Sequence, residues 1–395
     1  MIAVDEDRPA ARSFDLLNER VLTVAGIYGP NASGKSNVLN ALTWLSRAVA
    51  RSLRSWDDSI PRQPFKFQNG PSKPSHFGVE MMVDKVRYAY SVSLDDTRVL
   101  HEVLYSYPER RRRMLFEREG LNISFRRGSG ATSGTRELLT ETTLGLSAAM
   151  RLDERDIAKF GRQLTNIDSF EAHGSRTMFP WPGIHITRYS TRHLFYGSPD
   201  ESDELGADTT VAKAMLQFAD MGIGDVQVSE EVDEDGDLVR SLRLVHHSSE
   251  EKLAFDMRDE SAGTQTWFRL IGPVLHALKH GRTLLFDEID SSLHPRLSAK
   301  LVELFQDPDT NPRHAQLIFT SHDTSLLNHL NRDEVWLTEK GGDGMTTLTA
   351  LAEYGGDKVR RSLNLERAYL QGRFGAVPEI DQAILRTVAL DTQGE

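Results

Sequence analysis

The sequence contains no cysteine, which excludes a disulfide framework and a thiolate metal site. It also lacks any apolar run close to the roughly 18 residues that cross a bilayer, so we expect no membrane partner. The first residues, MIAVDEDRPAARSF, show no basic segment followed by an apolar one, and this predicts no secretory signal. Together these absences favour a soluble protein of the cytoplasm.

An excess of positive charge is missing as well. The chain carries 47 Lys and Arg against 58 Asp and Glu, a formal net charge of −11, which argues against a surface that coats nucleic acid. Arginines nevertheless gather in one region, at Arg110, Arg111, Arg112, Arg113, Arg126 and Arg127. Such a run is usually a solvated loop, and weak contact with DNA or RNA phosphates is the alternative.

The chain of 395 residues is longer than one compact core usually needs, so we expect a two-lobed domain or a domain with a large insertion. Strand and helix patterns alternate at both ends of the chain, with strands at 21–29, 283–289 and 315–322 and helices at 36–53 and 264–281. The middle is mixed, with hairpins at 76–95 and 226–247, a strand at 184–190, a helical region at 137–167 and a helix at 209–222. This order predicts an α/β fold, a mixed β-sheet core with helices on both faces plus an inserted α+β lobe. We expect the core over 1–70 and 251–395 and the insertion, with a return to the core, over 71–250.

Residues 26–37, GIYGPNASGKSN, join an apolar strand to a helix and match the P-loop pattern. Glycines in such a turn let backbone N–H groups converge on phosphate oxygens, and the start of the following helix favours negative charge. The pattern predicts that Lys35 reaches the β and γ phosphates of ATP and that the Ser36 hydroxyl binds Mg²⁺. The predicted nucleotide-binding residues are Gly29, Asn31, Ala32, Ser33, Gly34, Lys35, Ser36 and Asn37.

The second motif is an acidic pair that follows an apolar strand in TLLFDEIDSSLHP, residues 283–295. We predict that Asp287 binds the magnesium, directly or through water, and that Glu288 accepts a proton from the attacking water. Exposed acids after buried strands are common, so this motif alone is weak evidence for a nucleotide site. Together with the P-loop it becomes strong evidence.

A histidine ends the next apolar strand, in IFTSHDTSLL, residues 318–327. A lone histidine is more often structural. The order of strand, DE, strand and SH instead predicts that His322 contacts the γ-phosphate and orients the attacking water.

The stretch DESAGTQTWFRL, residues 259–270, places Ser261 and Gly263 just before a helix. A serine hydroxyl and helix N–H groups can bind an anion. Alone, this pattern is equally an ordinary helix cap. Between a P-loop and a DE motif, it favours a second phosphate cradle that one chain offers to the ATP of another.

These motifs, in this order, resemble the ATP-binding-cassette type of ATPase found in RecF, SMC and OLD proteins. GIYGPNASGKSNVLNAL, DESAGT, LLFDEIDSSLHP and FTSHD are most similar to stand-alone bacterial AAA-family ATPases of the abortive-infection, OLD-like group, and YLQGRFGAVP (369–378) resembles their C-terminal signature. The resemblance is diffuse between about 70 and 250, and DESAGT stands where transporters have LSGGQ. It implies a P-loop NTPase of the ABC-ATPase type that binds ATP and Mg²⁺ and dimerises around the nucleotide.

The sequence departs from that group in two places. Relatives usually begin with an additional strand before the segment that opens here, so the first strand of the sheet is expected to be missing. The glutamine that couples nucleotide to partner is also undefined, because Gln63 and Gln68 are both candidates.

The function implied by the resemblance is a Mg-dependent ATP hydrolase that controls a separately encoded effector, a nuclease or toxin, in bacterial defence against phage. A RecF- or SMC-like ATPase of DNA repair or chromosome maintenance is the alternative, although the insertion is too short and too irregular for a long coiled coil. A transporter subunit fits least, since it would lack the insertion and carry LSGGQ. A binding module without catalysis is disfavoured because Glu288 and His322 are both present.

Overall fold

A computed structural model describes residues 1–4, 8–14, 19–126, 132–152, 155–171, 190–196, 202–232, 238–291, 293–354 and 364–375. Its centre is a six-stranded sheet with the strand order β16-β15-β3-β14-β13-β9. Five of the strands run parallel and β16 is antiparallel to β15. The strands are β3 (Val24–Tyr28), β9 (Ile167–Glu171), β13 (Thr283–Asp287), β14 (Gln316–Thr320), β15 (Val335–Lys340) and β16 (Thr346–Ala350).

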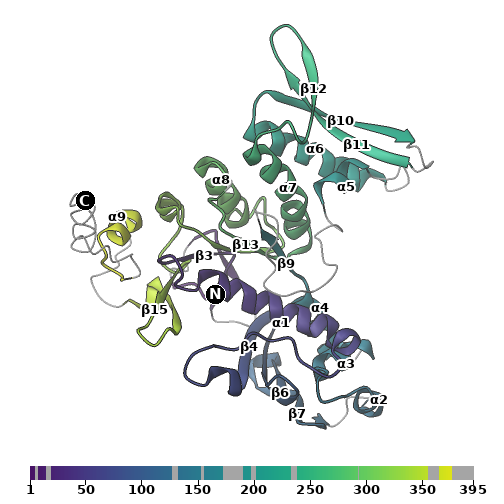
Figure 1. Ribbon diagram of the computed structural model, residues 1–395, viewed down its shortest axis with the longest axis vertical. Helices are drawn as coiled ribbons and strands as arrows, with labels where there is room; N and C mark the ends of the chain where they lie inside the picture. Colours follow the sequence, from purple (N-terminus) through teal and green to yellow (C-terminus); the bar gives the residue numbers. More distant parts are fainter. Residues whose placement is uncertain are drawn as a thin grey trace, which may run out of the picture.

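Both faces of this sheet are covered, which explains why its strands are continuous apolar runs. All five residues of β3 are buried. One face packs against α7 (Ala262–His280), α8 (Pro295–Gln306) and the short helices η4 (Thr324–His329) and α9 (Leu365–Leu370). The opposite face packs against α1 (Lys35–Ser55) through Leu39, Ile27 and Leu285. The expected mixed sheet with helices on both faces is therefore confirmed (Figure 1).

A second, antiparallel sheet of five strands lies on the far side of α1 (Figure 1). The predicted hairpin at 76–95 is confirmed as β4 (Ser75–Val83) and β5 (Val86–Leu94). The sheet continues with β6 (Val99–Tyr107), β7 (Arg113–Glu119) and β8 (Asn122–Phe125). Helices α2 (Thr132–Glu137), α3 (Gly145–Arg151) and α4 (Arg155–Thr165) belong to the same lobe. Trp44 of α1 stacks on Phe77 of β4 with ring centroids 4.3 Å apart, so α1 is shared by both cores.

A third sheet, with the order β10-β11-β12, projects from the molecule beside α6 (Figure 1). Its strands are β10 (Ile223–Val232), β11 (Leu238–His247) and β12 (Lys252–Asp256), and the helices next to it are α5 (Thr191–Tyr196) and α6 (Ser202–Ala219). The pairing of β10 with β11 confirms the predicted hairpin at 226–247. The predicted strand at 184–190 lies outside the described residues.

The N-terminal segment forms a small hairpin of its own. In it β1 (Ala11–Ser13) pairs with β2 (Arg20–Leu22), and Ile2 makes an isolated bridge to Val21. Arg8 ties the hairpin to the central sheet by ion pairs with Asp333 and Glu334, just before β15. Among the described residues, no helix combines the length and apolar character needed to cross a bilayer. The boundaries assigned to the insertion remain predictions.

Candidate nucleotide-binding site

The P-loop connects the end of β3 to the start of α1, as its sequence predicts. Three of its residues have positive φ, which bends the backbone tightly: Gly29 at 151°, Ala32 at 61° and Gly34 at 103°. Asn31, Ala32 and Asn37 are exposed, whereas Ser33 is buried. The turn therefore presents its backbone, rather than large side chains, to a ligand.

The two glycines are also needed for close contact with the β15–β16 hairpin. A Cβ atom on Gly29 would lie 2.4 Å from Thr338, and one on Gly34 would lie 2.3 Å from the Thr346 hydroxyl. Ser33 Oγ lies 2.6 Å from Thr338 Oγ1, and the Thr346 hydroxyl donates to the Ser33 carbonyl at 2.8 Å. The hairpin thus packs against the P-loop and supports it. The sequence analysis did not identify these two threonines as part of the site.

The N-terminus of α1 has no side-chain cap and no acidic residue in its first turn. By contrast, Ser261, His294 and Asn364 cap the starts of α7, α8 and α9 with their own side chains. The first N–H groups of a helix need an acceptor, and the partial positive charge there favours an anion. In this 21-residue helix, phosphate oxygens fit that requirement.

Lys35 lies at the centre of this turn, with only 7% of its surface exposed. Its ammonium donates to the carbonyl oxygens of Gly29 and Pro30, at 3.0 and 3.1 Å. Burial lowers the pKa of Lys35, and the nearby Asp287, Glu288 and Asp290 carboxylates oppose that shift. Contact of this buried ammonium with the phosphates stays a prediction.

The predicted metal ligands lie where α1, β13 and β14 meet. The Ser36 hydroxyl donates to Asp287 Oδ1 at 3.1 Å, which brings together the two predicted magnesium ligands. Thr320, at the end of β14, donates to the same oxygen at 2.5 Å. Among the described residues, no group of three or more His, Cys, Asp or Glu is placed to hold a metal ion, and Mg²⁺ bound to a nucleotide needs only one or two carboxylates.

Glu288 has φ of 54°, an uncommon value for a residue with a side chain. Its backbone N–H donates to Thr320 Oγ1 at 2.8 Å. Strained backbone of this kind concentrates at active sites, where surrounding contacts hold it in place. Thr320 therefore contacts the Asp287 carboxylate and the Glu288 backbone, although the sequence analysis did not single it out.

Asp290 connects this motif to the predicted histidine. Its carboxylate accepts from the Ser321 hydroxyl at 2.8 Å and from the backbone N–H of His322 at 3.0 Å. His322 is exposed at the end of β14, on the same sheet edge as the P-loop and Asp287. The carboxyl ends of these neighbouring parallel strands thus carry Lys35, Asp287 and His322 together.

Ser261 and Gly263 lie at the start of α7, apart from this group of residues. Ser261 is the N-cap, and its hydroxyl accepts from the Thr264 N–H at 3.1 Å, as in an ordinary helix cap. Ser261 is also exposed. The structure of one chain therefore leaves the role of this turn as a second phosphate cradle a prediction.

Gln63 and Gln68 are both exposed on the loop between α1 and β4, and the choice between them stays open. The arginine run lies at the β6–β7 connection, where Arg110 and Arg111 are exposed. Arg112 stacks over the Tyr105 ring at 3.8 Å, and Arg113 pairs with Glu109 at 3.3 Å. Arg127 and the end of the C-terminal signature, 376–378, lie outside the described residues.

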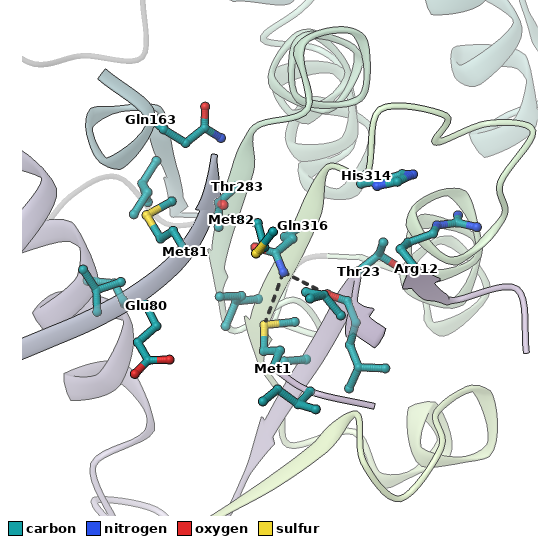
Figure 2. Close-up of a pocket in the computed structure, with 18 of the residues that line it drawn as sticks. Met1, Arg12, Thr23, Glu80, Met81, Met82, Gln163, Thr283, His314 and Gln316 are labelled. Carbon is teal, nitrogen blue, oxygen red and sulfur yellow. Dashed lines mark hydrogen bonds between the residues drawn. The ribbon is translucent and has the colours of Figure 1, made fainter. Parts of the chain in front are cut away.

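A cavity of about 600 Å³ lies away from the P-loop, between the N-terminal hairpin, the central sheet and β4 (Figure 2). Its lining is mostly apolar and includes Met1, Met81 and Met82, with Gln316 reaching the Leu22 carbonyl at 2.8 Å. None of the residues predicted to bind nucleotide or metal lines it. The cavity is therefore separate from the nucleotide site.

Comparison with solved structures gives distant similarities. The Smc head domain of Pyrococcus furiosus, solved with bound ScpA, is 13% identical, with 86% of this chain and 94% of that chain covered and a TM-score of 0.36. CbiO1 of Clostridium perfringens, part of the transporter complex CbiONQ, is 9% identical, with 88% of each chain covered and a TM-score of 0.33. The ATP-binding cassette MJ0796, a dimer with ADP and Pi, is 10% identical, with 87% and 97% covered and a TM-score of 0.30. No curated protein matches the sequence.

A family model described as "AAA domain, putative AbiEii toxin, Type IV TA system" matches residues 24–328. The match begins at β3, includes the P-loop and the DE motif, and ends after His322. It covers the larger part of the chain, including β3, β13 and β14, the strands that the predicted site residues follow. The chain belongs to this family of AAA domains.

Proposed function

We propose that this protein is a Mg-dependent ATP hydrolase that closes as a two-fold dimer around two ATP molecules. The observation that supports it best is the meeting of Ser36, Asp287 and Thr320 at one carboxylate oxygen, beside the uncapped start of α1. A phosphate site next to a metal site fits a nucleoside triphosphate better than a simple anion.

In the proposed reaction, the N–H groups of the P-loop and α1 hold the phosphates, and Lys35 neutralises their charge. Ser36 and Asp287 would hold magnesium, which would neutralise part of the phosphate charge. Glu288 takes the proton of the attacking water, and His322 orients that water toward the γ-phosphate.

Ser261 and Gly263 complete the site in trans. One P-loop neutralises only part of the negative charge on the γ-phosphate. The partial positive charge at the start of α7 from a second chain neutralises the rest. Because each chain has one P-loop and one DESAGT turn, two-fold pairing completes both sites with the same surface on each side. The exposure of Ser261 supports this role, since its turn is accessible to a second chain.

Measuring ATP turnover tests the catalytic assignment. Glu288→Gln should still bind ATP and hydrolyse it about 10²–10⁴-fold more slowly, the usual contribution of a general base. Lys35→Ala should lose affinity for ATP as well. Glu250→Gln changes an exposed acid in a different loop and should leave the rate unchanged. A Glu288→Gln enzyme with the parental rate would remove Glu288 from this role.

Sedimentation of Glu288→Gln with and without Mg-ATP tests closure, since ATP should favour the dimer. Ser261→Arg should bind ATP but neither dimerise nor turn over. In a mixture of Ser261→Arg with Lys35→Ala, a mixed dimer contains one intact site, so some activity should return. Normal hydrolysis by a monomeric Ser261→Arg chain would overturn the trans arrangement.

We further propose that the nucleotide cycle controls a separately encoded nuclease or toxin in defence against phage, as in the abortive-infection, OLD-like group. The family description, which names a putative toxin and a toxin–antitoxin system, supports this context. Expression of the chain with its adjacent reading frames should lower phage plaque counts, and Glu288→Gln should abolish that protection. Protection that survives Glu288→Gln would separate the ATPase from defence.

A further inference from the structure

The cavity of about 600 Å³ is enclosed by parts of the chain that lie far apart in the sequence. Its walls are mostly apolar, and they include Val21 of the N-terminal hairpin, Val38 and Leu42 of α1, Met81 of β4 and Ile318 of β14. A volume of this size is typical of sites that bind small molecules. The walls therefore suit a ligand with an apolar body.

One side of the cavity is basic. Arg12 and His314 both line it, and Figure 2 shows them on the side opposite Glu80. Glu80 already pairs with Arg87, at 2.5 Å. Glu19, the other acid of the lining, is exposed. Among the described residues, neither Arg12 nor His314 forms an ion pair, so their side of the cavity can accept an anion.

Arg12 is a buried cation that lacks an anionic partner. Only 8% of its surface is exposed, and its guanidinium donates to the carbonyl of Pro9 and, at 3.2 Å, to that of Gln306. Its Nε–H is buried and has no hydrogen-bond partner in the described part of the chain. Burial lowers the pKa of Arg12, and the Asp307 carboxylate opposes that shift. Because a buried charge is costly unless it is paired, an anionic ligand would stabilise this guanidinium.

The turn that carries Arg313 and His314 is held in one shape. Asn311 is buried, donates to the Ala315 carbonyl at 2.9 Å and accepts the Ala315 N–H at 2.7 Å. His314 has φ of 58°, an uncommon value for a residue with a side chain. Burial, followed by the charge of Arg12, lowers the pKa of His314. The basic groups are thus close enough to repel one another, and an anion between them would relieve that repulsion.

We propose that this cavity binds a small amphipathic carboxylate, with its apolar chain against the apolar walls and its carboxylate at Arg12, Arg313 and His314. The fork of an arginine matches the two oxygens of a carboxylate, and the chain leaves water when it enters the cavity. A neutral molecule with the same chain lacks the charge-assisted hydrogen bonds and should bind more weakly. None of the residues predicted to bind nucleotide lines the cavity, so this site is independent of the proposed ATP hydrolysis.

Equilibrium binding of dodecanoate to the full chain, below its micelle concentration, tests the site. Arg12→Gln should weaken binding about ten- to a hundred-fold, the range for losing a hydrogen bond to a charged group. The double variant Arg313→Gln/His314→Asn leaves Arg12 in place and should weaken binding as well, and asparagine tolerates the positive φ. Met81→Trp fills part of the cavity and should abolish binding. Arg296→Gln, at an exposed arginine of α8 outside the lining, is the charge control and should bind like the parent.

Two further comparisons complete the experiment. Met221→Trp adds the same bulk at a residue that is 94% exposed, and should leave dodecanoate binding unchanged. Dodecanol has the same chain without the charge, and should bind to the parent about tenfold more weakly or less well still. Urea unfolding curves identify the variants that fold, and the double variant carries the test if Arg12→Gln does not.

Three outcomes would overturn the proposal. A folded parent that binds no dodecanoate has no such site. Equal affinity for dodecanol and dodecanoate would leave an apolar cavity without a carboxylate end. Undiminished binding by Met81→Trp, or by the folded charge variants, would place the ligand elsewhere on the protein.

Discussion

Removing the Thr320 hydroxyl tests how the site is organised. Thr320 Oγ1 donates to Asp287 at 2.5 Å and accepts the Glu288 N–H at 2.8 Å, so one atom contacts the proposed metal ligand and the backbone of the proposed general base. Thr320 is fully buried, and valine has the same shape without the hydroxyl. Thr320→Val therefore removes two hydrogen bonds and creates little new space.

The magnitude follows from those two bonds. A hydrogen bond to a charged group contributes about 1.5–3 kcal/mol, and a partly buried N–H left without an acceptor costs about 1–3 kcal/mol. We therefore expect Thr320→Val to lower the free energy of unfolding by about 2–4 kcal/mol. If the carboxylate bond is needed in the transition state, kcat/KM for ATP should fall about ten- to a hundred-fold.

The assay is ATP turnover as a function of Mg²⁺ concentration, combined with urea unfolding. Thr320→Val should need more Mg²⁺ for half-maximal rate because Asp287 is no longer held. Thr320→Ser restores the hydroxyl and should recover most of the rate, which separates the bond from general damage to the core. If Thr320→Val matched the parent in rate and Mg²⁺ requirement, the hydroxyl would have no role in positioning the acids.

Three further outcomes can be checked. Gly34→Ala should lower the free energy of unfolding by about 1–3 kcal/mol and weaken phosphate binding, because φ is 103° and the new Cβ would clash with Thr346. Gly342→Ala is the control: its Cβ would have no atom within 4 Å, so a urea titration should show unchanged stability. Burial first, then the charge of Arg282, lowers the pKa of His276 from 6.5 to about 3. The unfolded chain therefore binds this proton first, so stability should fall as the pH drops from 6.5 toward 3, and His276→Gln should flatten that loss in acid-unfolding curves. Replacement of all four arginines of 110–113 with Gln should reduce the salt dependence of any DNA or RNA binding in filter assays, and an unchanged slope would assign the run to a solvated loop.

The parts of the site that the sequence predicted are short and contiguous. Gly29, Gly34 and Lys35 belong to one turn, whose geometry is set by its own backbone, so a local pattern is enough to recognise it. Asp287 and His322 were found because each ends an apolar strand, and parallel strands bring their carboxyl ends to one edge of the sheet.

Other elements were missed because local patterns do not define them. The region 137–167 was predicted as broadly helical, and the structure divides it among the end of α2, helices α3 and α4 and the start of β9. Strands β7, β8 and β12 were not predicted, and β12 is almost wholly exposed, so no alternation of buried and exposed residues marks it. The hairpin of β15 and β16 was likewise absent from the prediction.

By itself, therefore, the sequence determined which residues make up the candidate site: a P-loop, an acidic pair, a histidine and an α/β core to carry them. The tertiary structure alone decided which groups hold that chemistry in place. Thr320 lies 33 residues from Asp287, and Thr346 lies 313 residues from the Ser33 carbonyl that it bonds. The direction of a side chain toward such a distant partner depends on how the sheet and its hairpin pack, and no repeating pattern in the chain encodes it.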